Sequence, residues 1–209
     1  MKKLYFLITA GGTREYIDPV RFITNASSGR MGLALAQAAA KTGNKVTLIT
    51  TIPNQFKIQN SKFKIENVES AEDMFNAVKK HFLKCDCLIM AAAVSDYTPA
   101  KKSKIKIKKS KSELILKLKP TTDILKWAGE HKKHQKVVGF ALEDRNLRKN
   151  AEKKLIGKNL DMIIANEPSA IGAKKSTIQI KQRYQEWLII KNTNKELSAK
   201  KIINLLSKN

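Results

Sequence analysis

Short apolar runs alternate with amphipathic helix patterns through most of the chain, and this alternation constrains the fold more than any other feature. The runs at 87–92 and 162–165 are continuously apolar, as expected of strands covered on both faces. Strands that alternate with helices form a parallel sheet, because each crossover helix returns the chain to the same end of the sheet. The sequence therefore predicts an α/β fold: a Rossmann-like, mostly parallel sheet with helices on both faces. The expected strands are Leu4–Thr9, Lys45–Thr50, Phe63–Val68, Cys87–Ala92, Lys136–Leu142 and Asp161–Ala165, and the expected helices are Gly29–Thr42, Ala71–Lys84, Thr122–His131 and Asn146–Lys158.

The last part of the chain departs from this alternation. Two short strand patterns, Thr177–Ile180 and Trp187–Lys191, are followed by a helix pattern at Leu197–Leu206. This order is typical of an antiparallel hairpin at the edge of a sheet, closed by a helix. Neither an internal repeat nor a long linker interrupts the 209 residues, so we expect a single domain over residues 1–209.

A lysine-rich segment at residues 101–120 also interrupts the alternation. Ile105–Lys108 and Leu116–Lys119 each alternate apolar residues with lysines, which is the period-two pattern of a strand with one apolar face. Lys109–Glu113 between them predicts a turn, so the segment is expected to form a β-hairpin arm. The apolar face of a projecting arm needs cover, and a second copy of the chain is the simplest partner. The arm therefore predicts a homodimer.

The first strand ends in a glycine pair, but the helix pattern that should follow it begins only at Gly29. A dinucleotide-binding chain would place G-x-G-x-x-G directly after the strand, whereas here Gly11-Gly12 and Gly29-x-x-Gly32 are separated by residues 13–28. Glycine lets a ligand approach the backbone, and a helix N-terminus attracts phosphate. The pattern predicts a phosphate site at the glycines, with residues 13–28 as a substrate loop over the carboxyl ends of the strands. A plain capped helix is the alternative.

Polar side chains in this insert and after the strand at 87–92 suit an anionic ligand. Arg14 or Arg21 could clamp a phosphate or a carboxylate. The small residues of AAAVSDYTP, at 91–99, would let a flat ligand lie against the backbone. Asp96 in this motif could accept a hydrogen bond from a ribose hydroxyl or hold a metal, with a plain loop or N-cap aspartate as the alternative.

Composition and charge limit the classes of protein to which this chain can belong. The formal net charge is +23, but aromatic residues make up only 6% of the chain. The charge therefore fits a polyanionic small substrate as well as it fits a nucleic acid. No apolar run reaches the roughly 20 residues that a membrane helix needs. Cys85 and Cys87 would point to opposite faces of a strand, so we expect reduced thiols and a cytoplasmic location.

Six motifs occur in a fixed order along the chain. They are ITAGGTREYIDPVRFITNASSGRMG at 8–32, AAAVSDYTP at 91–99, KIKK at 106–109, TTDIL at 121–125, VVGFALE at 137–143 and KNLDMIIAN at 158–166. Together they resemble the bacterial-type phosphopantothenoylcysteine synthetase family, from residue 4 to about residue 190. Because the sequence begins at the first strand of that pattern, we expect a chain without the fused decarboxylase domain of many bacterial relatives. A separate decarboxylase is then a possible partner.

The resemblance implies a ligase that joins 4′-phosphopantothenate to L-cysteine in coenzyme A biosynthesis. The reaction runs through an acyl-nucleotide and releases pyrophosphate. It implies Mg²⁺, a homodimer and a nucleoside triphosphate as co-substrate; CTP, the choice of most bacterial members, is favoured, and ATP stays open. Lysines and a metal suit this chemistry, because an attack by a carboxylate on a triphosphate concentrates negative charge.

The resemblance also implies roles for individual residues. Catalytic roles fall to Asn25, which grips the acyl group, and to Lys106, which assists formation of the acyl-nucleotide. Lys104, Lys108 and Lys109 are close alternatives in register. The implied nucleotide-binding residues are Gly11, Ser27, Gly29, Gly32, Ala92, Asp96, Lys106, Phe140, Lys154 and Lys158. The implied substrate-binding residues are Arg21, which would reach phosphopantothenate in the neighbouring subunit, and Asn25, Ala92, Ala93 and Asp96. The motifs do not identify the metal ligands.

Two alternative functions are of different classes. An NAD(P)-binding oxidoreductase domain would need a contiguous glycine motif and an acidic residue at the end of the second strand, where Thr47–Thr50 lies instead. A basic nucleic-acid-binding module would show affinity with a steep salt dependence. We expect neither a specific nucleic acid nor a membrane as a partner.

Overall fold

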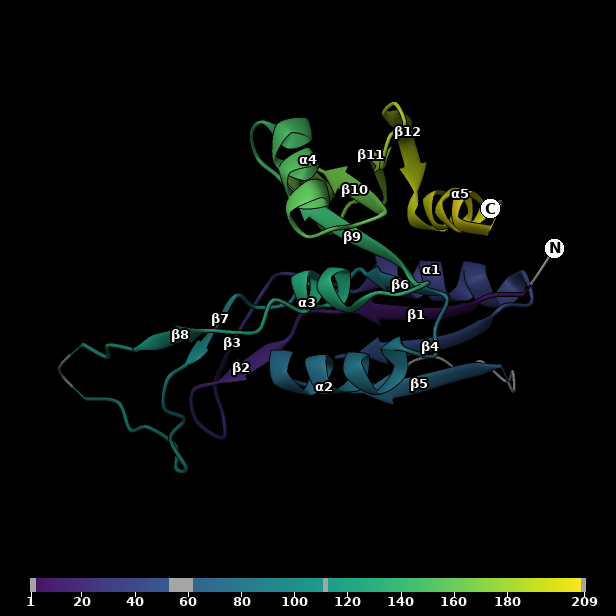
Figure 1. Ribbon diagram of the computed structural model, residues 1–209. Coiled ribbons are helices and arrows are strands. Elements are labelled where there is room, and N and C mark those ends of the chain that lie inside the picture. The colour runs from purple at the N-terminus through teal and green to yellow at the C-terminus, as the bar shows by residue number, and fades with distance from the viewer. Residues whose placement is uncertain (1–2, 53–61, 111–112, 208–209) are drawn as a thin grey trace.

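The computed structural model describes residues 3–52, 62–110 and 113–207. Within them an eight-stranded sheet has the strand order β12-β11-β10-β9-β6-β1-β4-β5, with helices on both faces (Figure 1). Every pairing from β5 across to β10 is parallel, so the predicted α/β architecture is confirmed. The parallel strands are β1 (Tyr5–Ala10), β4 (Lys45–Thr50), β5 (Phe63–Asn67), β6 (Cys87–Met90), β9 (Lys136–Leu142) and β10 (Met162–Asn166).

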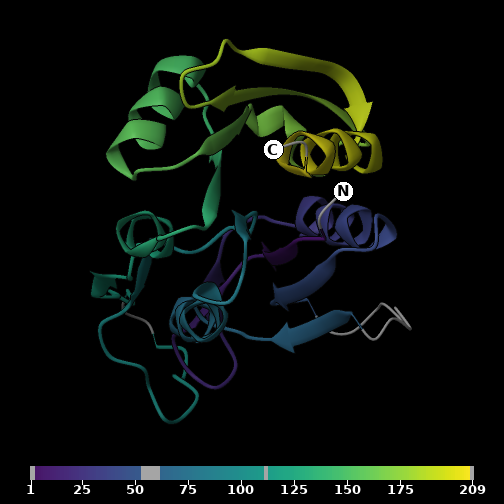
Figure 2. The ribbon, with the colours of Figure 1, turned by 45° about the vertical axis from the view of Figure 1, so that its right-hand side comes forward.

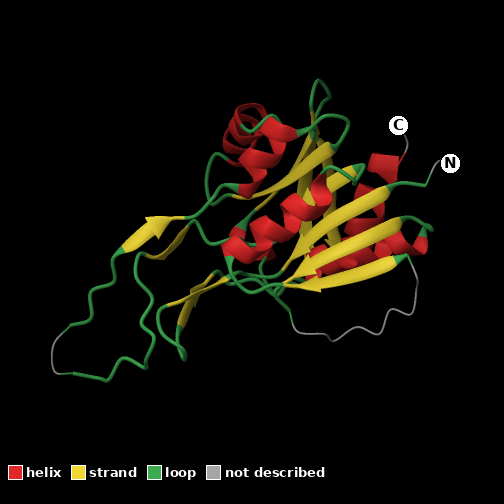
Figure 3. Ribbon diagram, turned by 60° about the horizontal axis from the view of Figure 1, so that its bottom comes forward, coloured by secondary structure: helices red, strands yellow, loops and turns green. Residues whose placement is uncertain are grey.

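The fully buried strand β1 shows why the fold has three layers. Its alternate residues enter two different apolar clusters: Phe6 and Ile8 lie in one, and Tyr5 and Leu7 in the other. The first cluster is completed by helices α1 (Arg30–Lys41) and α5 (Lys195–Ser207), which lie side by side (Figure 2). The second is completed by α2 (Ala71–Phe82), α3 (Ile124–His131) and α4 (Leu147–Gly157) on the opposite face (Figure 3).

The antiparallel edge predicted near the end of the chain is also present. A short 3-10 turn, η1 (Pro168–Ala170), leads from β10 into β11 (Lys175–Gln182), which pairs antiparallel with β10 and with β12 (Leu188–Asn194). Both strands are longer than the predicted ones. Helix α5 follows β12 directly and packs against α1.

The strand after α2 is shorter than predicted. It ends at Met90 and not at Ala92, because the backbone turns: the Ala91 N–H donates to the Ile89 carbonyl at 3.2 Å. The Ala92 N–H donates instead to Thr9 Oγ1 at 3.1 Å. The alanines therefore leave the ladder and lie over the end of the sheet.

The insert at 13–28 was expected to be a loop, but it contains a small hairpin. Strands β2 (Arg14–Tyr16) and β3 (Phe22–Thr24) pair antiparallel. The rings of Tyr16 and Phe22 meet edge to face at 5.4 Å. Asp18 forms the turn, since its Oδ1 accepts hydrogen bonds from the N–H groups of Val20 and Arg21.

The predicted strands of the arm at 101–120 are largely wrong. Strands β7 (Tyr97–Pro99) and β8 (Leu118–Pro120) pair only at the base of the arm, and Ile105–Lys108 is not a strand (Figure 1). Of the predicted Leu116–Lys119, only the last two residues are in a strand. Part of the predicted turn, residues 111 and 112, lies outside the described residues. The physical reason is lack of cover, because Ile105 and Ile115 are 76% and 86% exposed.

Candidate functional site

The strand order changes direction between β1 and β6, which is where ligands bind in open α/β sheets. Two segments leave the sheet here, Gly11–Thr13 after β1 and Ala91–Ser95 after β6, and we call the space above them the crevice. The Ala93 N–H donates to the Gly11 carbonyl at 2.8 Å, and the Thr13 N–H donates to the Ala93 carbonyl at 3.3 Å. The Ser95 N–H donates to Thr13 Oγ1 at 2.9 Å. These bonds give the crevice a fixed backbone floor.

Glycines let the two ends of the insert meet over β1. Gly11 and Gly29 have φ values of +91° and +64°, which favour glycine. A Cβ on Gly29 would lie 2.9 Å from the Gly11 nitrogen, and a Cβ on Gly12 would lie 2.7 Å from the Asn25 carbonyl oxygen. Larger residues would push the two ends apart, so the glycines set the shape of the crevice.

The N-terminus of α1 has no side-chain cap. Its N-cap is Gly29, whereas the N-cap of α2 is Ser70, which forms a capping box with Asp73. Ser27 accepts from the Gly29 N–H at 3.3 Å and does not cap the helix. An uncapped N-terminus beside glycines is suited to phosphate, and the phosphate site stays a prediction.

Gly32 has a different position from the one expected. A Cβ there would lie 2.6 Å from the Thr9 carbonyl oxygen and 2.7 Å from the Ala10 Cβ. Gly32 therefore faces β1 and allows α1 to pack closely on the sheet.

Asn25 joins the insert to the segment after β6. Its Nδ2 donates to the Val94 carbonyl at 3.1 Å, so the structure brings Asn25 together with Ala92 and Ala93. The same segment continues to Asp96, whose carbonyl accepts from the Thr121 N–H at 2.9 Å. The Asp96 side chain is exposed.

A pair of lysines from α4 and its C-cap forms a second part of the site. Lys154 Nζ donates to the Phe140 carbonyl at 2.8 Å, and Lys158 Nζ pairs with Asp123 at 2.6 Å. Burial lowers the pKa of Lys154, and the charge of Lys158 lowers it further. Three carboxylates oppose this shift, those of Asp123, Glu143 and Asp96.

Asp123 and Glu143 are site residues to which sequence reasoning gave no role. Asp123 caps α3 by accepting from the Lys126 N–H at 3.0 Å. Burial alone would raise its pKa, but the hydrogen bonds from Lys158 and Lys126 lower it. Glu143 accepts from Asn150 Nδ2 at 2.8 Å. Both lie inside the motifs TTDIL and VVGFALE, so an acidic residue within a quoted motif was the available signal.

Arg21 and Lys106 lie apart from the crevice residues in this single chain. Arg21 donates from Nε and Nη2 to Asp18 Oδ2, at 3.0 and 2.6 Å, and from Nη2 to the Ile107 carbonyl. Lys106 is exposed on the arm, as are Lys104, Lys108 and Lys109, so the choice among these lysines stays a prediction.

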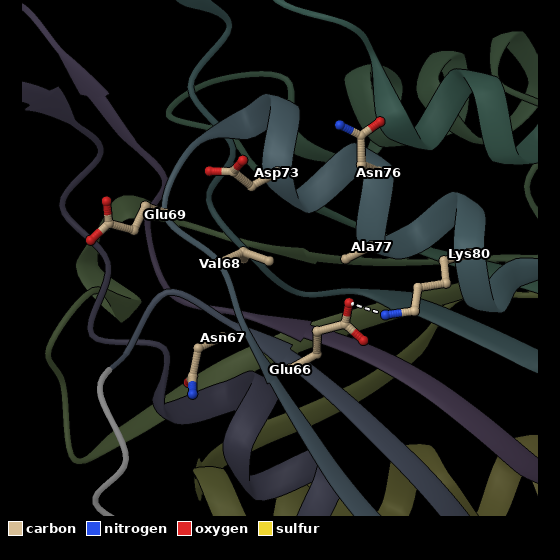
Figure 4. A pocket seen from close by; sticks show the side chains of 8 residues that line it. All are labelled: Glu66, Asn67, Val68, Glu69, Asp73, Asn76, Ala77 and Lys80. Carbon is tan, nitrogen blue, oxygen red and sulfur yellow. Dashed lines mark hydrogen bonds and ion pairs between the residues drawn. The ribbon is translucent and has the colours of Figure 1, made fainter.

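Two hollows lie near the carboxyl end of the sheet. One of about 400 Å³, between β5 and α2, presents the carboxylates of Glu66, Glu69 and Asp73 (Figure 4). Lys80 pairs with Glu66 at 3.0 Å there, and the acidic lining disfavours a triphosphate. The other, of about 310 Å³, lies beside Gly11 and is lined by Arg14, Thr50, Thr51, Ile52, Asn67, Val68 and Glu69.

A membrane and a metal cluster are two partners for which the described ranges hold no matching feature. No helix there has the length and apolar character to cross a bilayer. No group of three or more His, Cys, Asp or Glu side chains there is arranged to hold a metal ion. Cys85 and Cys87 are buried and free, and burial raises the pKa of Cys85 to about 12, so this thiol is not a nucleophile at neutral pH.

Comparisons with known proteins agree with this fold. The chain is 47% identical to the coenzyme A biosynthesis bifunctional protein CoaBC of Bacillus subtilis over 169 residues, which are 81% of this chain and 41% of that protein. A crystal structure of the C-terminal domain of a protein of the same name superimposes with a TM-score of 0.83 at 36% identity, covering 99% of this chain and 95% of that one. A Cab2 variant in complex with phosphopantothenate-cysteine shares the fold, with a TM-score of 0.75 at 18% identity over 99% and 89% of the two chains.

The extent of these matches defines the family. The chain spans about half the length of the curated relatives it matches. The family model of the DNA/pantothenate metabolism flavoprotein C-terminal domain matches residues 1–209. The chain therefore belongs to the family of DNA/pantothenate metabolism flavoprotein C-terminal domains.

Proposed function

We propose that the chain is a phosphopantothenate–cysteine ligase that acts in coenzyme A biosynthesis through an acyl-nucleotide intermediate. The observation that carries this proposal is the crevice in a chain of this family. Glycine backbone and the uncapped N-terminus of α1 form one part of the site, and Lys154 and Lys158 form another. Both parts suit the phosphates of a nucleotide.

In the proposed first step, a carboxylate oxygen of phosphopantothenate attacks the α-phosphorus, and the bond to pyrophosphate breaks. Backbone N–H groups near Gly11 and Gly29 hold the phosphates, while the lysines neutralise the charge that develops. Lys158 would exchange its bond to Asp123 for a phosphate oxygen. Lys154, whose ammonium donates to the Phe140 carbonyl in the free chain, would gain a phosphate oxygen as a partner.

In the proposed second step, the amine of cysteine attacks the acyl carbon and the nucleoside monophosphate leaves, with loss of a proton from the amine. Asn25 would hold the acyl group in this step, and its hydrogen bond to the Val94 carbonyl, beside Ala93 on the crevice floor, supports this role. Its amide can donate to a carbonyl oxygen in place of Val94.

Mg²⁺ is the implied metal, and it would supply positive charge to the phosphate oxygens. The exposed carboxylate of Asp96 fits one protein ligand of a magnesium ion that the phosphates carry. The ribose hydroxyl remains the alternative partner of Asp96.

CTP is the proposed nucleotide, with ATP as the alternative. The test measures pyrophosphate release by the purified chain with phosphopantothenate, cysteine and Mg²⁺, in parallel with CTP and with ATP. We expect release that requires phosphopantothenate and is faster with CTP. A folded protein that releases no pyrophosphate with either nucleotide would contradict the proposal.

A homodimer formed through the arm is part of the proposal. Exposed apolar side chains gather on the arm and at its base: Tyr97, Ile105, Leu114, Ile115 and Leu118. A second copy would cover them, and in the proposed dimer Arg21 reaches phosphopantothenate of the partner subunit. Sedimentation velocity tests this directly, and a monomer at assay concentrations would refute it.

The proposal also includes a decarboxylase partner and a cytoplasmic location. The relatives named bifunctional are about twice as long, which supports a decarboxylase, fused or separate, as the source of the preceding chemistry. A cytoplasmic location is proposed, because nucleoside triphosphates are available there. The oxidoreductase and nucleic-acid-binding alternatives are not favoured, since the family match covers the whole chain.

A further inference from the structure

The outgoing half of the arm is held to the insert hairpin at defined points. The Ser103 N–H donates to the Ile17 carbonyl at 2.9 Å. The Ile107 N–H donates to Asp18 Oδ2 at 3.1 Å, and Arg21 Nη2 donates to the Ile107 carbonyl at 2.5 Å. The backbone donor and acceptor of Ile107 are thus both satisfied by one ion pair.

The two carboxylate oxygens of Asp18 have separate tasks. Oδ1 accepts from the Val20 and Arg21 N–H groups, at 2.8 and 2.9 Å, and forms the hairpin turn. Oδ2 accepts from the Arg21 guanidinium and from the Ile107 N–H. The side chain of Asp18 is 0% exposed, so this oxygen has no access to water as a substitute partner.

Charge keeps this arrangement in place. Burial alone would raise the pKa of Asp18, but hydrogen bonds from Val20, Arg21 and Ile107 hold it well below its ordinary value. Because the pKa is lowered on folding, the stabilisation is present above the ordinary carboxyl pKa. It declines as the pH falls below that ordinary value and is gone once the pH has passed the lowered one.

Within the described residues 113–120, the returning half of the arm makes no hydrogen bond to the insert hairpin. Ile115 in that half is 86% exposed, whereas Ile107 is half-buried against the hairpin. Lys106 is the residue directly before Ile107, and its side chain is exposed. The half of the arm that is anchored is therefore the half that carries the predicted catalytic lysine.

We propose that Asp18, with Arg21, is a positioning residue that fixes the arm at Ile107 and thereby places Lys106. This inference rests on the proposed ligase function. Asp18 touches neither substrate nor nucleotide in this role; it acts through the backbone beside Lys106. We call the contact of Asp18 and Arg21 with Ile107 the latch.

The variant Asp18→Asn separates the two tasks of the side chain. The amide oxygen can keep the turn, but the amide nitrogen replaces Oδ2 and presents donors to the Ile107 N–H and to the Arg21 guanidinium. We expect the Ile107 amide to lose its protection from hydrogen exchange, measured by NMR, while the amides of Val20 and Arg21 keep theirs. Glu130→Gln, which removes one exposed carboxylate from α3, is the charge-matched control.

The same variant should reduce the kcat of pyrophosphate release and leave the KM for nucleotide unchanged. We expect a loss of about 10- to 100-fold, because a small misplacement of a catalytic group has effects of this size. Ile107→Pro removes the N–H donor without touching Asp18 or Arg21. It should give a similar loss, and the double variant should lose little more than either single variant.

Two results would overturn the inference. If the Ile107 amide stays protected in Asp18→Asn, the latch does not hold the arm in solution. If protection is lost while kcat is unchanged or higher, the latch does not place Lys106. A wild-type chain that releases no pyrophosphate would instead refute the ligase proposal, and the exchange measurement would still decide whether the latch exists.

Discussion

The insert at 13–28 and the arm at 101–120 both extend from the carboxyl end of the sheet, yet among the described residues the insert is the more fully hydrogen-bonded of the two. The insert has β2 and β3 along its length and is hydrogen-bonded to α2, because the buried Glu15 accepts from the Ala71 N–H at 2.8 Å. The arm pairs only at β7 and β8, although its sequence alternates more regularly.

The difference teaches that alternation and cover are separate requirements. A period-two pattern shows that one face of a segment is apolar, but not what will bury that face. In the insert, Tyr16, Phe22 and Asp18 find partners within a few residues. In the arm, the side chains of Ile105 and Ile115 stay 76% and 86% exposed in the single chain, which is why a second copy is proposed to cover them.

The largest expected effect is on the rate of pyrophosphate release, from a substitution in the arm that leaves the stability of the fold unchanged. Lys106→Gln removes the cation proposed for the α-phosphate, and we expect pyrophosphate release to fall about 10²- to 10³-fold. The Tm should not change, because the side chain is exposed. Lys101→Gln is the matched control. Near-normal release in Lys106→Gln would move the role to Lys104, Lys108 or Lys109.

The insert should show its own effect on a different step. Asn25→Asp replaces the donor to the Val94 carbonyl with an acceptor. We expect acyl-nucleotide still to form while the amide product falls about 10²-fold. Quenched-flow analysis that separates pyrophosphate from the final product checks this, and equal loss of both would place Asn25 in the first step instead.

Stability should depend on the insert. Glu15→Ala deletes a side chain whose residue is only 2% exposed and removes the acceptor of the Ala71 N–H. We expect a loss of about 1–3 kcal/mol, as for other buried groups left without a partner. Thermal unfolding measures this loss. A change within experimental error would show that the insert does not contribute to the stability of the fold.

The matching substitution in the arm should leave the fold unchanged. Ile115→Ser alters a side chain that is 86% exposed, so the free energy of unfolding of the monomer should change by less than about 0.5 kcal/mol. Self-association in sedimentation velocity should weaken. If Ile115→Ser lowers stability as much as Glu15→Ala does, the contrast between the two segments fails.

The smallest expected effect is proton uptake by Lys154, in the body of the domain, when nucleotide binds. The pKa of Lys154 is lowered, so the charged form is disfavoured in the free protein and an anion should restore it. At about pH 9.5, below the ordinary lysine value, nucleotide binding should take up a fraction of a proton, and near neutral pH it should take up less. Calorimetry in two buffers of different ionisation enthalpy measures this. Lys154→Arg should abolish the uptake, and Ile115→Ser should not change it.

The sequence was sufficient for the sheet and for the crevice floor, because apolar periodicity and glycine spacing are local signals. Gly11 and Gly29 lie beside each other at the end of β1, and Lys154 donates to the Phe140 carbonyl. Contacts between segments that are distant in the sequence have no local pattern from which they could be predicted. The packing of Gly32 on β1 and the binding of Ile107 by Asp18 depend on where the fold places the two partners.

The packing of α5 against α1 also determines when the crevice can be completed during synthesis. Helix α1 supplies the N-terminus beside Gly29, and its apolar flank is covered by Ala199, Ile202, Ile203 and Leu206. On the ribosome, that flank stays uncovered until residues 195–207 have emerged. Translation must therefore reach α5 before α1 is secured, and a pause before residue 195 would prolong exposure of α1 to aggregation and to chaperones.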